Sequence, residues 1–441
     1  MANNTDIDHQ RRSVETRVVS DTESNDVASQ LQHAHRQSQD EGSIDAWLAI
    51  AGSFLVYFSS FGIMNSFGYF QYLYLSGFLR DYATSEIALI GTMQLALMYL
   101  TGPVVGSLYD AYGTKYLYPV GALGCCLSLI TLSFTQPNHI WQQFLCQGLL
   151  FGLTVACGVQ PALTVIAKLF KRRKALAMGL VASGSSAGGV CYPIMFSRLV
   201  PRIGFAWSLR VGALTSLFCY TVAWCITKTD HTSKPLSSLS CLFDYSGFKD
   251  VRYVCLSLGS FLANLGLYGP YYYAEPFCAF LDPTAKIKPY LLPLINASSF
   301  VGRIIGGHFA DTIGRLNLLY PMTVLSGLLS LLMWRSALNV GTLTAFVCLY
   351  GFCSGVFISV MPAATSQIVP DDKLGAQLGA FSSLTAIAVF VGTPIAGSLI
   401  KDDSVPGYMP LVTYSGSTML AGGVMLLIGR VLHGRDLRKK W

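Results

Sequence analysis

The sequence predicts an all-α membrane protein in which twelve helices cross the bilayer in two groups of six. Apolar residues make up 52% of the 441-residue chain and charged residues only 12%, whereas soluble domains carry roughly 25% charged residues. The apolar residues come in repeated runs of about 20, the length of a helix that crosses the hydrocarbon core. One long polar connection separates six such runs from the next six. These observations exclude a water-soluble globular protein.

The spanning elements are predicted to be helices rather than the strands of a membrane barrel. Barrel strands are about ten residues long and alternate apolar with polar side chains. The runs here are longer, continuously apolar and rich in Leu, Ala and Gly. A helix also satisfies its own backbone hydrogen bonds, which lipid cannot do.

Polar or charged residues end each apolar run and divide it from the next. In the first half of the chain, the predicted spans cover residues 47–69, 87–109, 116–135, 141–167, 175–198 and 206–227. In the second half, they cover residues 253–275, 289–309, 316–334, 341–366, 374–400 and 409–430.

The segments outside the spans are polar. Those before the first span are rich in Ser, Asp, Gln and His and contain no apolar run that would serve as a signal peptide. Lysines and arginines are more numerous in the loops on the side of the two tails, which places both tails in the cytoplasm. In chain order we expect a disordered cytoplasmic tail at 1–43, a six-helix bundle at 44–227, a cytoplasmic linker at 228–250, a second bundle at 251–431 and a basic cytoplasmic tail at 432–441.

The two halves repeat one motif at an offset of about 201 residues. The pattern G-x-x-x-D-x-x-G ends the second and the eighth span and is followed in each case by a basic residue. Its members are Gly106, Asp110, Gly113 and Lys115 in the first half, and Gly307, Asp311, Gly314 and Arg315 in the second. The glycines allow close helix approach, and an aspartate at a span end can pair with a base or cap a helix N-terminus. We expect a cytoplasmic contact that holds one conformation; a fixed turn with a helix cap is the alternative.

These segments resemble the G-x-L-x-D-x-x-G-x-K/R loop found in both halves of major facilitator superfamily transporters. The second copy departs from that pattern at Phe309, where leucine is usual. Residues 41–47 and 168–185 further resemble segments of the monocarboxylate-transporter-like branch, especially its fungal members, with Glu41 and Ser43 as departures. The resemblance implies the major facilitator fold, two six-helix pseudo-repeats and transport by alternating access, in which the repeated loop takes part.

Arg303 is the charge placed well inside a predicted span, and a buried arginine needs a partner or a wet cavity. Asn296, Ser299 and Arg303 follow at intervals of three and four and therefore share one helix face. The guanidinium can bind a carboxylate through two hydrogen bonds. We predict a substrate pathway that also includes Asn65, Tyr69 and Tyr268. An arginine tied to backbone carbonyls is the alternative for Arg303, and an interfacial aromatic belt is the alternative for the tyrosines.

The resemblance aligns Arg303 with an arginine that animal monocarboxylate carriers use for substrate anions and proton coupling. Their aspartate falls at Ser299 and their span-one lysine at Asn65, so lactate-type proton symport is not implied. Hydroxyls, amides and aromatic rings suit a larger, partly aromatic metabolite. The resemblance leaves protons open as a coupling partner, although Glu275 and the other span carboxylates are predicted at span ends.

The sequence contains no motif for catalysis, a cofactor or a metal. The G-x-S-x-G match at 184–188 lies in a helical span rather than after a strand, so a hydrolase is excluded. The dispersed histidines and cysteines predict no metal site, and the missing phosphate loop excludes ATP-driven pumping. The net charge of +7 is accounted for by loops beside spans, so we expect the lipid bilayer and a small metabolite as partners and no nucleic acid.

The predicted function is gradient-driven or facilitative transport of a small, carboxylate-bearing organic metabolite. Export of a secondary metabolite is one direction; an uptake carrier for a vitamin or organic acid is the alternative. A second class is a membrane nutrient sensor that binds a metabolite without transporting it. The expected location is the plasma membrane, with the vacuolar membrane as the alternative.

Overall fold

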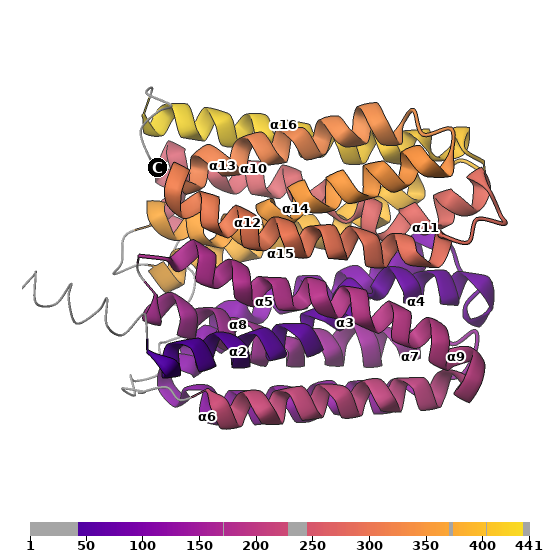
Figure 1. The fold of residues 1–441 in the computed structure, drawn as a ribbon, viewed down its shortest axis with the longest axis horizontal. Coiled ribbons are helices and arrows are strands. Elements are labelled where there is room, and N and C mark those ends of the chain that lie inside the picture. The colour runs from indigo at the N-terminus through magenta and orange to yellow at the C-terminus, as the bar shows by residue number, and fades with distance from the viewer. Residues whose placement is uncertain (1–42, 171, 228–244, 370–373, 403, 435–441) are drawn as a thin grey trace, which may run out of the picture. The chain divides into compact units, whose positions relative to one another are not determined.

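Helices make up all the regular secondary structure in the part of the chain that the structure describes (Figure 1). The structure is a computed structural model that describes residues 43–170, 172–227, 245–369, 374–402 and 404–434. All but the last residue of the first predicted tail, most of the predicted linker and the end of the last tail lie outside these ranges. The all-α prediction is confirmed.

The first half of the chain contains both long helices and interrupted ones. They are α2 (Ile44–Ser59), α3 (Phe61–Asn65), α4 (Phe67–Leu73), the π-helical turn η1 (Tyr74–Phe78), α5 (Thr84–Tyr112), α6 (Thr114–Leu132), α7 (Ile140–Gln143), the π-helical turn η2 (Phe144–Leu150), α8 (Phe151–Leu169) and α9 (Lys174–Ile226). At the start of α2, the Ser43 hydroxyl accepts a hydrogen bond of 3.1 Å from the Ala46 amide and caps the helix. From Leu48 onward the chain forms one compact unit.

The second half follows the predicted order. Its elements are η4 (Tyr245–Lys249), α10 (Val251–Leu267), α11 (Gly269–Leu281), η5 (Lys288–Tyr290), α12 (Leu291–Ile313), α13 (Arg315–Leu329), η6 (Ser330–Trp334), α14 (Val340–Ile368), α15 (Leu374–Ser398), η8 (Pro406–Tyr408) and α16 (Met409–His433). The predicted span at 253–275 is divided at Tyr268, because Pro270 at the start of α11 has no amide to continue the α10 ladder.

The fifth and sixth predicted spans are divided within residues 198–206, as expected, but by a sharp turn instead of a loop. The structure continues the helix from the fifth predicted span through residue 203 and turns at Gly204, where φ is 81°. That backbone conformation suits glycine, and it divides the 53-residue element α9 into the fifth and the sixth predicted span.

Nine helices of the described residues are long and apolar enough to cross a membrane. One of them is α9, which supplies two spans because of its turn. The nine do not include α12, α10 or α11. The last two have 17 and 13 residues and are each too short to span the membrane alone. If α9 is counted as two spans, α12 as one, and α10 with α11 as one, the number of spans rises from nine to twelve. The count of twelve stays a prediction.

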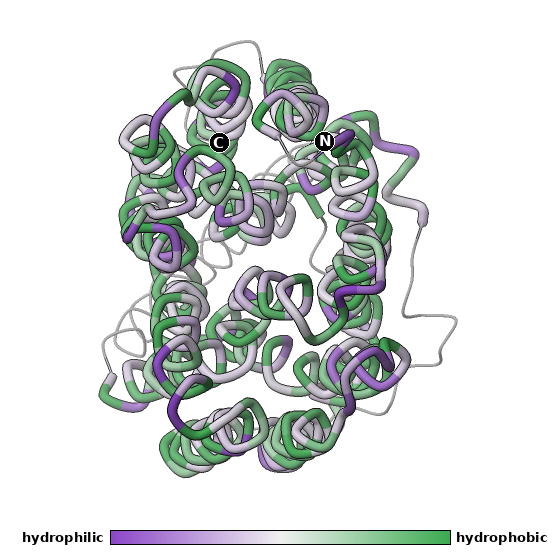
Figure 2. The backbone as a smooth tube through the Cα atoms, turned by 90° about the vertical axis from the view of Figure 1, so that its right-hand side faces the viewer, coloured by the Kyte–Doolittle hydropathy of each residue, from purple (hydrophilic) through white to green (hydrophobic). Residues whose placement is uncertain are grey.

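The helices expose large apolar side chains instead of burying them all. Leu123, Phe218 and Leu332 are each about two-thirds exposed, as are many others. Figure 2 shows apolar residues along most of the helical tubes. Contiguous apolar surface of this extent is stable against lipid and not against water.

Helices from the two halves of the chain pack directly on each other. The long helix α12 lies along α9 and α14, and α15 lies along α5. Glycines allow the close approach of α9 and α12: a Cβ atom at Gly179 would lie 2.5 Å from the Arg303 carbonyl oxygen. These helix pairs position the two groups of residues described next.

Candidate functional site

Arg303 lies near the middle of α12 and points towards α9. Its side chain is only 1% exposed. Nη1 donates a hydrogen bond of 2.6 Å to the carbonyl oxygen of Ala182 and a second one to the Ser185 hydroxyl. Nε donates to the Ser299 hydroxyl at 3.3 Å, one turn back on its own helix. The guanidinium therefore connects a helix of the second half with a helix of the first.

Four tyrosines lie within electrostatic range of this guanidinium. They are Tyr57 on α2, Tyr99 on α5, Tyr271 on α11, and Tyr268 between α10 and α11. Tyr57, Tyr268 and Tyr271 are buried, and Tyr99 is half-buried. Phenol rings with hydroxyls provide both apolar contact and hydrogen-bond donors. Arg303 is thus surrounded by an aromatic, weakly polar environment.

No carboxylate of the described residues lies within ion-pair distance of Arg303. Arg252 and Arg315, by contrast, each lie within 4 Å of a carboxylate, those of Asp250 and Asp311. A buried cation without an anionic partner is costly, and its three hydrogen bonds leave some of the five guanidinium N–H donors unused. The site can therefore accept an anion, and a carboxylate would match the planar donor geometry.

The predicted face of α12 is brought against α9. Ser299 accepts a hydrogen bond of 3.3 Å from the Ser186 hydroxyl. Asn296 is buried beside Gly189, where an added Cβ would lie 2.5 Å from its carboxamide. Its amide nitrogen donates to the Leu292 carbonyl at 3.0 Å, while its Oδ1 has no hydrogen-bond partner among the described residues. Asn296 Oδ1 is therefore a free acceptor beside α9.

The first-half members of the predicted pathway separate into two places. Asn65 donates a hydrogen bond of 3.4 Å to the Ser185 carbonyl and so lies next to the residue that binds Arg303. Tyr69 instead stacks on Phe196, with ring centroids 6.3 Å apart. Tyr69 is also absent from the tyrosines that act electrostatically on Arg303. The structure thus brings Asn65 close to the arginine and places Tyr69 beside Phe196.

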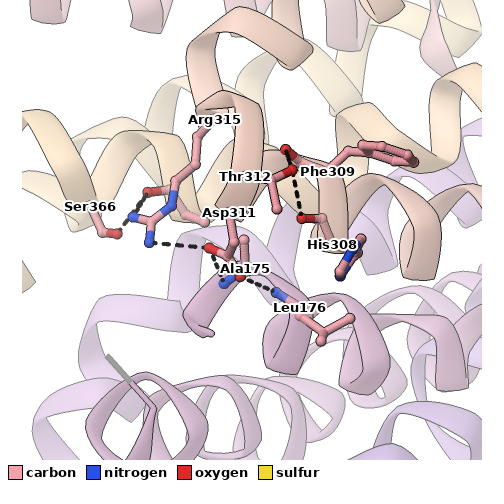
Figure 3. A network of polar contacts seen from close by, with 9 residues as sticks. Ala175, Leu176, His308, Phe309, Asp311, Thr312, Arg315 and Ser366 are labelled. Atoms are coloured by element: carbon pink, nitrogen blue, oxygen red, sulfur yellow. Dashed lines mark hydrogen bonds and ion pairs between the residues drawn. The ribbon is translucent and has the colours of Figure 1, made fainter. Parts of the chain in front are cut away.

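A second group of polar contacts joins the end of α12 to the start of α9 (Figure 3). Asp311 Oδ1 accepts a hydrogen bond of 3.2 Å from the Ala175 amide, and Oδ2 accepts one of 2.9 Å from the Leu176 amide. Arg315 Nη2 lies 3.7 Å from Asp311 Oδ1. A Cβ at Gly307 would lie 2.6 Å from the Ala175 carbonyl oxygen. We call these five residues the latch.

Asp311 therefore caps a helix that belongs to the other half of the chain. The first amides of a helix lack internal acceptors and carry partial positive charge, so a carboxylate there is favourable. Arg315 extends the network to α14, because its Nη1 donates to the Ala363 carbonyl at 3.1 Å. Figure 3 shows Asp311 between Arg315 and the α9 amides.

The backbone conformation explains why each motif ends in a glycine. Gly113 separates α5 from α6 at φ 67°, and Gly314 separates α12 from α13 at φ 112°. Residues with a side chain rarely adopt these angles. The spacing of both motifs thus marks a tight turn between two spans.

The first copy of the motif has different surroundings. An added Cβ at Gly106 would meet no atom within 4 Å, in contrast to Gly307. The Lys115 ammonium lies 5.7 Å from the centroid of the Tyr116 ring. The side chain of Asp110 lies outside the described residues. The second copy therefore supplies the described contact between the halves.

Sequence reasoning missed several residues that surround the arginine. Ser185 and Ser186 lie in the small-residue stretch at 184–188, whose spacing indicated only close helix packing. Tyr99 was missed as well. Serines on the packed face of a span were the available signal, because small polar residues hydrogen-bond across membrane helices.

The structure is a bundle of apolar helices with a buried arginine between its halves, and no carboxylate of the described residues pairs with that arginine. Such a bundle is typical of a membrane transporter of small molecules. The family comparison agrees: the Major Facilitator Superfamily model matches residues 49–393 and 290–437. The chain belongs to this superfamily and is a multi-pass secondary transporter, not an enzyme.

Curated fungal relatives cover nearly the same length. The chain is 34% identical to the Agnestins efflux protein of Paecilomyces divaricatus over 391 residues, 88% of this chain and 87% of that protein. It is 31% identical to the Fujikurins efflux protein of Gibberella fujikuroi over 408 residues, 92% of this chain and 87% of that protein.

A solved structure shares the fold. The human organic anion transporter TETRAN superposes with a TM-score of 0.67 over 86% of this chain and 99% of that one, at 15% sequence identity. The likeness at this identity concerns the fold alone.

Proposed function

We propose that this transporter exports a carboxylate-bearing, partly aromatic metabolite across the plasma membrane. One observation carries the proposal: Arg303 is buried among tyrosines, and no carboxylate of the described residues pairs with it. A substrate carboxylate would supply the missing anion. Aromatic rings of the substrate would pack on the tyrosines.

Export is favoured over uptake by the relatives. Two of them are named as efflux proteins, for agnestins and for fujikurins. We assign the chain to the monocarboxylate-transporter-like branch of the superfamily on the segments 41–47 and 168–185. The distribution of basic residues supports a cytoplasmic position for both tails.

The mechanism follows from the contacts between the halves. The bundles at 44–227 and 251–431, joined by the linker at 228–250, would rock about a midplane site at Arg303. With the latch closed, the α9–α12 interface is shut at the end where α12 ends. Opening requires Asp311 to leave the α9 amides and Arg303 to exchange its α9 acceptors for the substrate carboxylate. Binding and opening are coupled because both act on α9.

The experiment is transport by the purified full chain in vesicles. A panel of aromatic carboxylic acids is compared with the matching neutral carboxamides, which have nearly the same size. We expect flux of acids but not of carboxamides. Equal flux of both would contradict a role for the carboxylate, and specific binding without flux would favour the sensor. Flux only towards the cytoplasmic face of the protein would favour uptake.

Arg303→Ala should weaken acid binding, because it removes the charged hydrogen bonds to the carboxylate. Such bonds are worth about 1.5–3 kcal/mol, so affinity should fall about 10- to 150-fold. Arg303→Lys keeps the charge but loses the planar fork and should fall in between. The matched control is Arg198→Ala, because Arg198 lies on α9 but is exposed. Unchanged transport in Arg303→Ala would refute the proposed site.

A further inference from the structure

Glu275 is the one buried acidic side chain of the described residues. It lies within α11 and is only 7% exposed. The prediction from hydropathy placed it at the end of a span. The structure continues the helix to Leu281, so its carboxyl group lies inside the packed region rather than at its edge.

The environment of Glu275 offers no direct counter-ion. On the elements that pack against α11, the charged group that acts electrostatically on its carboxyl is Lys288 in η5. Lys288 lies beyond ion-pair distance, with its ammonium 5.6 Å from the centroid of the Tyr72 ring. The titratable neighbours that feel the Glu275 charge are Tyr69 on α4 and Cys278 on its own helix.

The ionised form of this carboxyl is unfavourable in the observed conformation. Burying a carboxylate is costly unless a cation or several donors compensate for the lost water. The described residues donate no hydrogen bond to Glu275, and Lys288 is too far away to pair with it. Binding one proton removes the charge and most of the cost.

Glu275 also lies where the two halves of the chain meet. Gly68 of α4 is so close to α11 that an added Cβ would lie 2.5 Å from the Tyr271 carbonyl oxygen. The rings of Phe67 and Tyr272 are in contact, with centroids 5.2 Å apart. This junction lies towards η5, where α12 begins, whereas the latch lies where α12 ends. Glu275 therefore belongs to the opposite end of the pathway from Asp311.

A short connection leads from Glu275 to the arginine site. Tyr271 precedes Glu275 by one helical turn and so shares its face of α11. Tyr271 is within electrostatic range of Arg303, and its hydroxyl lies 3.2 Å from the Ser354 hydroxyl. Movement of α11 thus changes the surroundings of both groups together.

We propose that Glu275 is a proton-binding site controlled by the junction of α4 and α11. The carboxylate takes up one proton when this junction closes around it, as in the observed conformation, and releases it when the junction opens to water and to Lys288. This role rests on the proposed transport function, in which the proton is then the coupling ion. Substrate and proton then move under control of the same helix.

The first test measures protonation without any substrate. Infrared difference spectra of the purified full chain in lipid nanodiscs are recorded between alkaline and mildly acidic buffer. We expect the C=O stretching band of a protonated carboxyl group, lost in Glu275→Gln and kept in the control Glu86→Gln. Glu86 is a suitable control because its side chain is exposed and only accepts a hydrogen bond from the Ala83 amide at the start of α5. A band that persists in Glu275→Gln, or is absent from the natural chain, overturns the proposal.

The second test measures coupling in vesicles that contain a pH-sensitive dye, with radiolabelled phthalate as probe. Phthalate is an aromatic carboxylate that crosses bare lipid slowly. We expect phthalate-dependent proton flux in the natural chain, loss of proton flux with retained phthalate exchange in Glu275→Gln, and loss of both in Arg303→Ala. Phthalate flux without proton flux in the natural chain overturns the coupling. Absence of phthalate flux counts against the proposed function, while the infrared result still decides the proton site.

Discussion

The latch gives the most direct test of how the two halves are held together. Asp311→Ala removes the acceptors of the Ala175 and Leu176 amides, which lie at 3.2 and 2.9 Å. Arg315 loses its neighbour at 3.7 Å but keeps the Ala363 carbonyl. The substitution therefore acts mainly on the start of α9.

The magnitude follows from two contributions. Loss of a helix cap costs about 0.5–2 kcal/mol, and loss of a negative charge at a helix N-terminus costs about 0.3–1 kcal/mol. The closed state should lose about 1–3 kcal/mol, which shifts the ratio of closed to open molecules about 5- to 150-fold. Asp311→Asn keeps one acceptor oxygen and should lie between Asp311→Ala and the natural chain.

Double electron–electron resonance would report the shift as a change in distance distribution. Spin labels are placed at Tyr116, where α6 begins, and at Leu432, near the end of α16; both side chains are exposed. The labels require a genetically encoded residue because the chain has 12 cysteines. We expect a longer-distance population that grows in the order natural chain, Asp311→Asn, Asp311→Ala.

The control is Asp282→Ala. Asp282 accepts hydrogen bonds only within its own turn, from Thr284, at the far end from the latch. This variant should leave the distance distribution unchanged. Identical distributions for Asp311→Ala and the natural chain would refute the reasoning that the cap holds the halves together.

Two further predictions concern glycines and are measured by thermal unfolding in detergent. Gly307→Ala should destabilise the chain by about 1–3 kcal/mol through overpacking, since its Cβ would meet the Ala175 backbone, whereas Gly106→Ala should be tolerated in open space; equal losses in both variants would contradict this. Gly314→Ala should cost about 1–3 kcal/mol because φ is 112° there, and an unchanged unfolding temperature would show that the turn adapts.

Local features of the chain were predictable from the sequence. The length and continuity of the apolar runs determine where helices form, because a span must be long enough for the bilayer and must satisfy its own backbone. The repeated motif marked the turns at Gly113 and Gly314, since spacing along the chain is preserved in the fold. The shared face of Ser299 and Arg303 followed from helical periodicity alone.

Two predicted span boundaries differ from the structure, each for a local reason. The break within α9 is shorter than predicted, because a single glycine, Gly204, makes the turn that the prediction assigned to a loop. Glu275 was placed at a span end because hydropathy falls there. Hydropathy measures composition, whereas burial depends on which helix covers the residue.

Contacts across the halves were decided only by the tertiary structure. The sequence indicated that Arg303 needs a partner but not that Ser185 and the Ala182 carbonyl supply it. The two motif copies look alike in sequence, yet only Gly307 is packed against another backbone while Gly106 faces open space. Helical periodicity orders residues along one helix, but the rotation and pairing of two helices far apart in the chain depend on how their side chains pack. The sequence alone therefore determined the spans, their turns and the buried charge, and the packing of α12 on α9 determined what that charge and the latch contact.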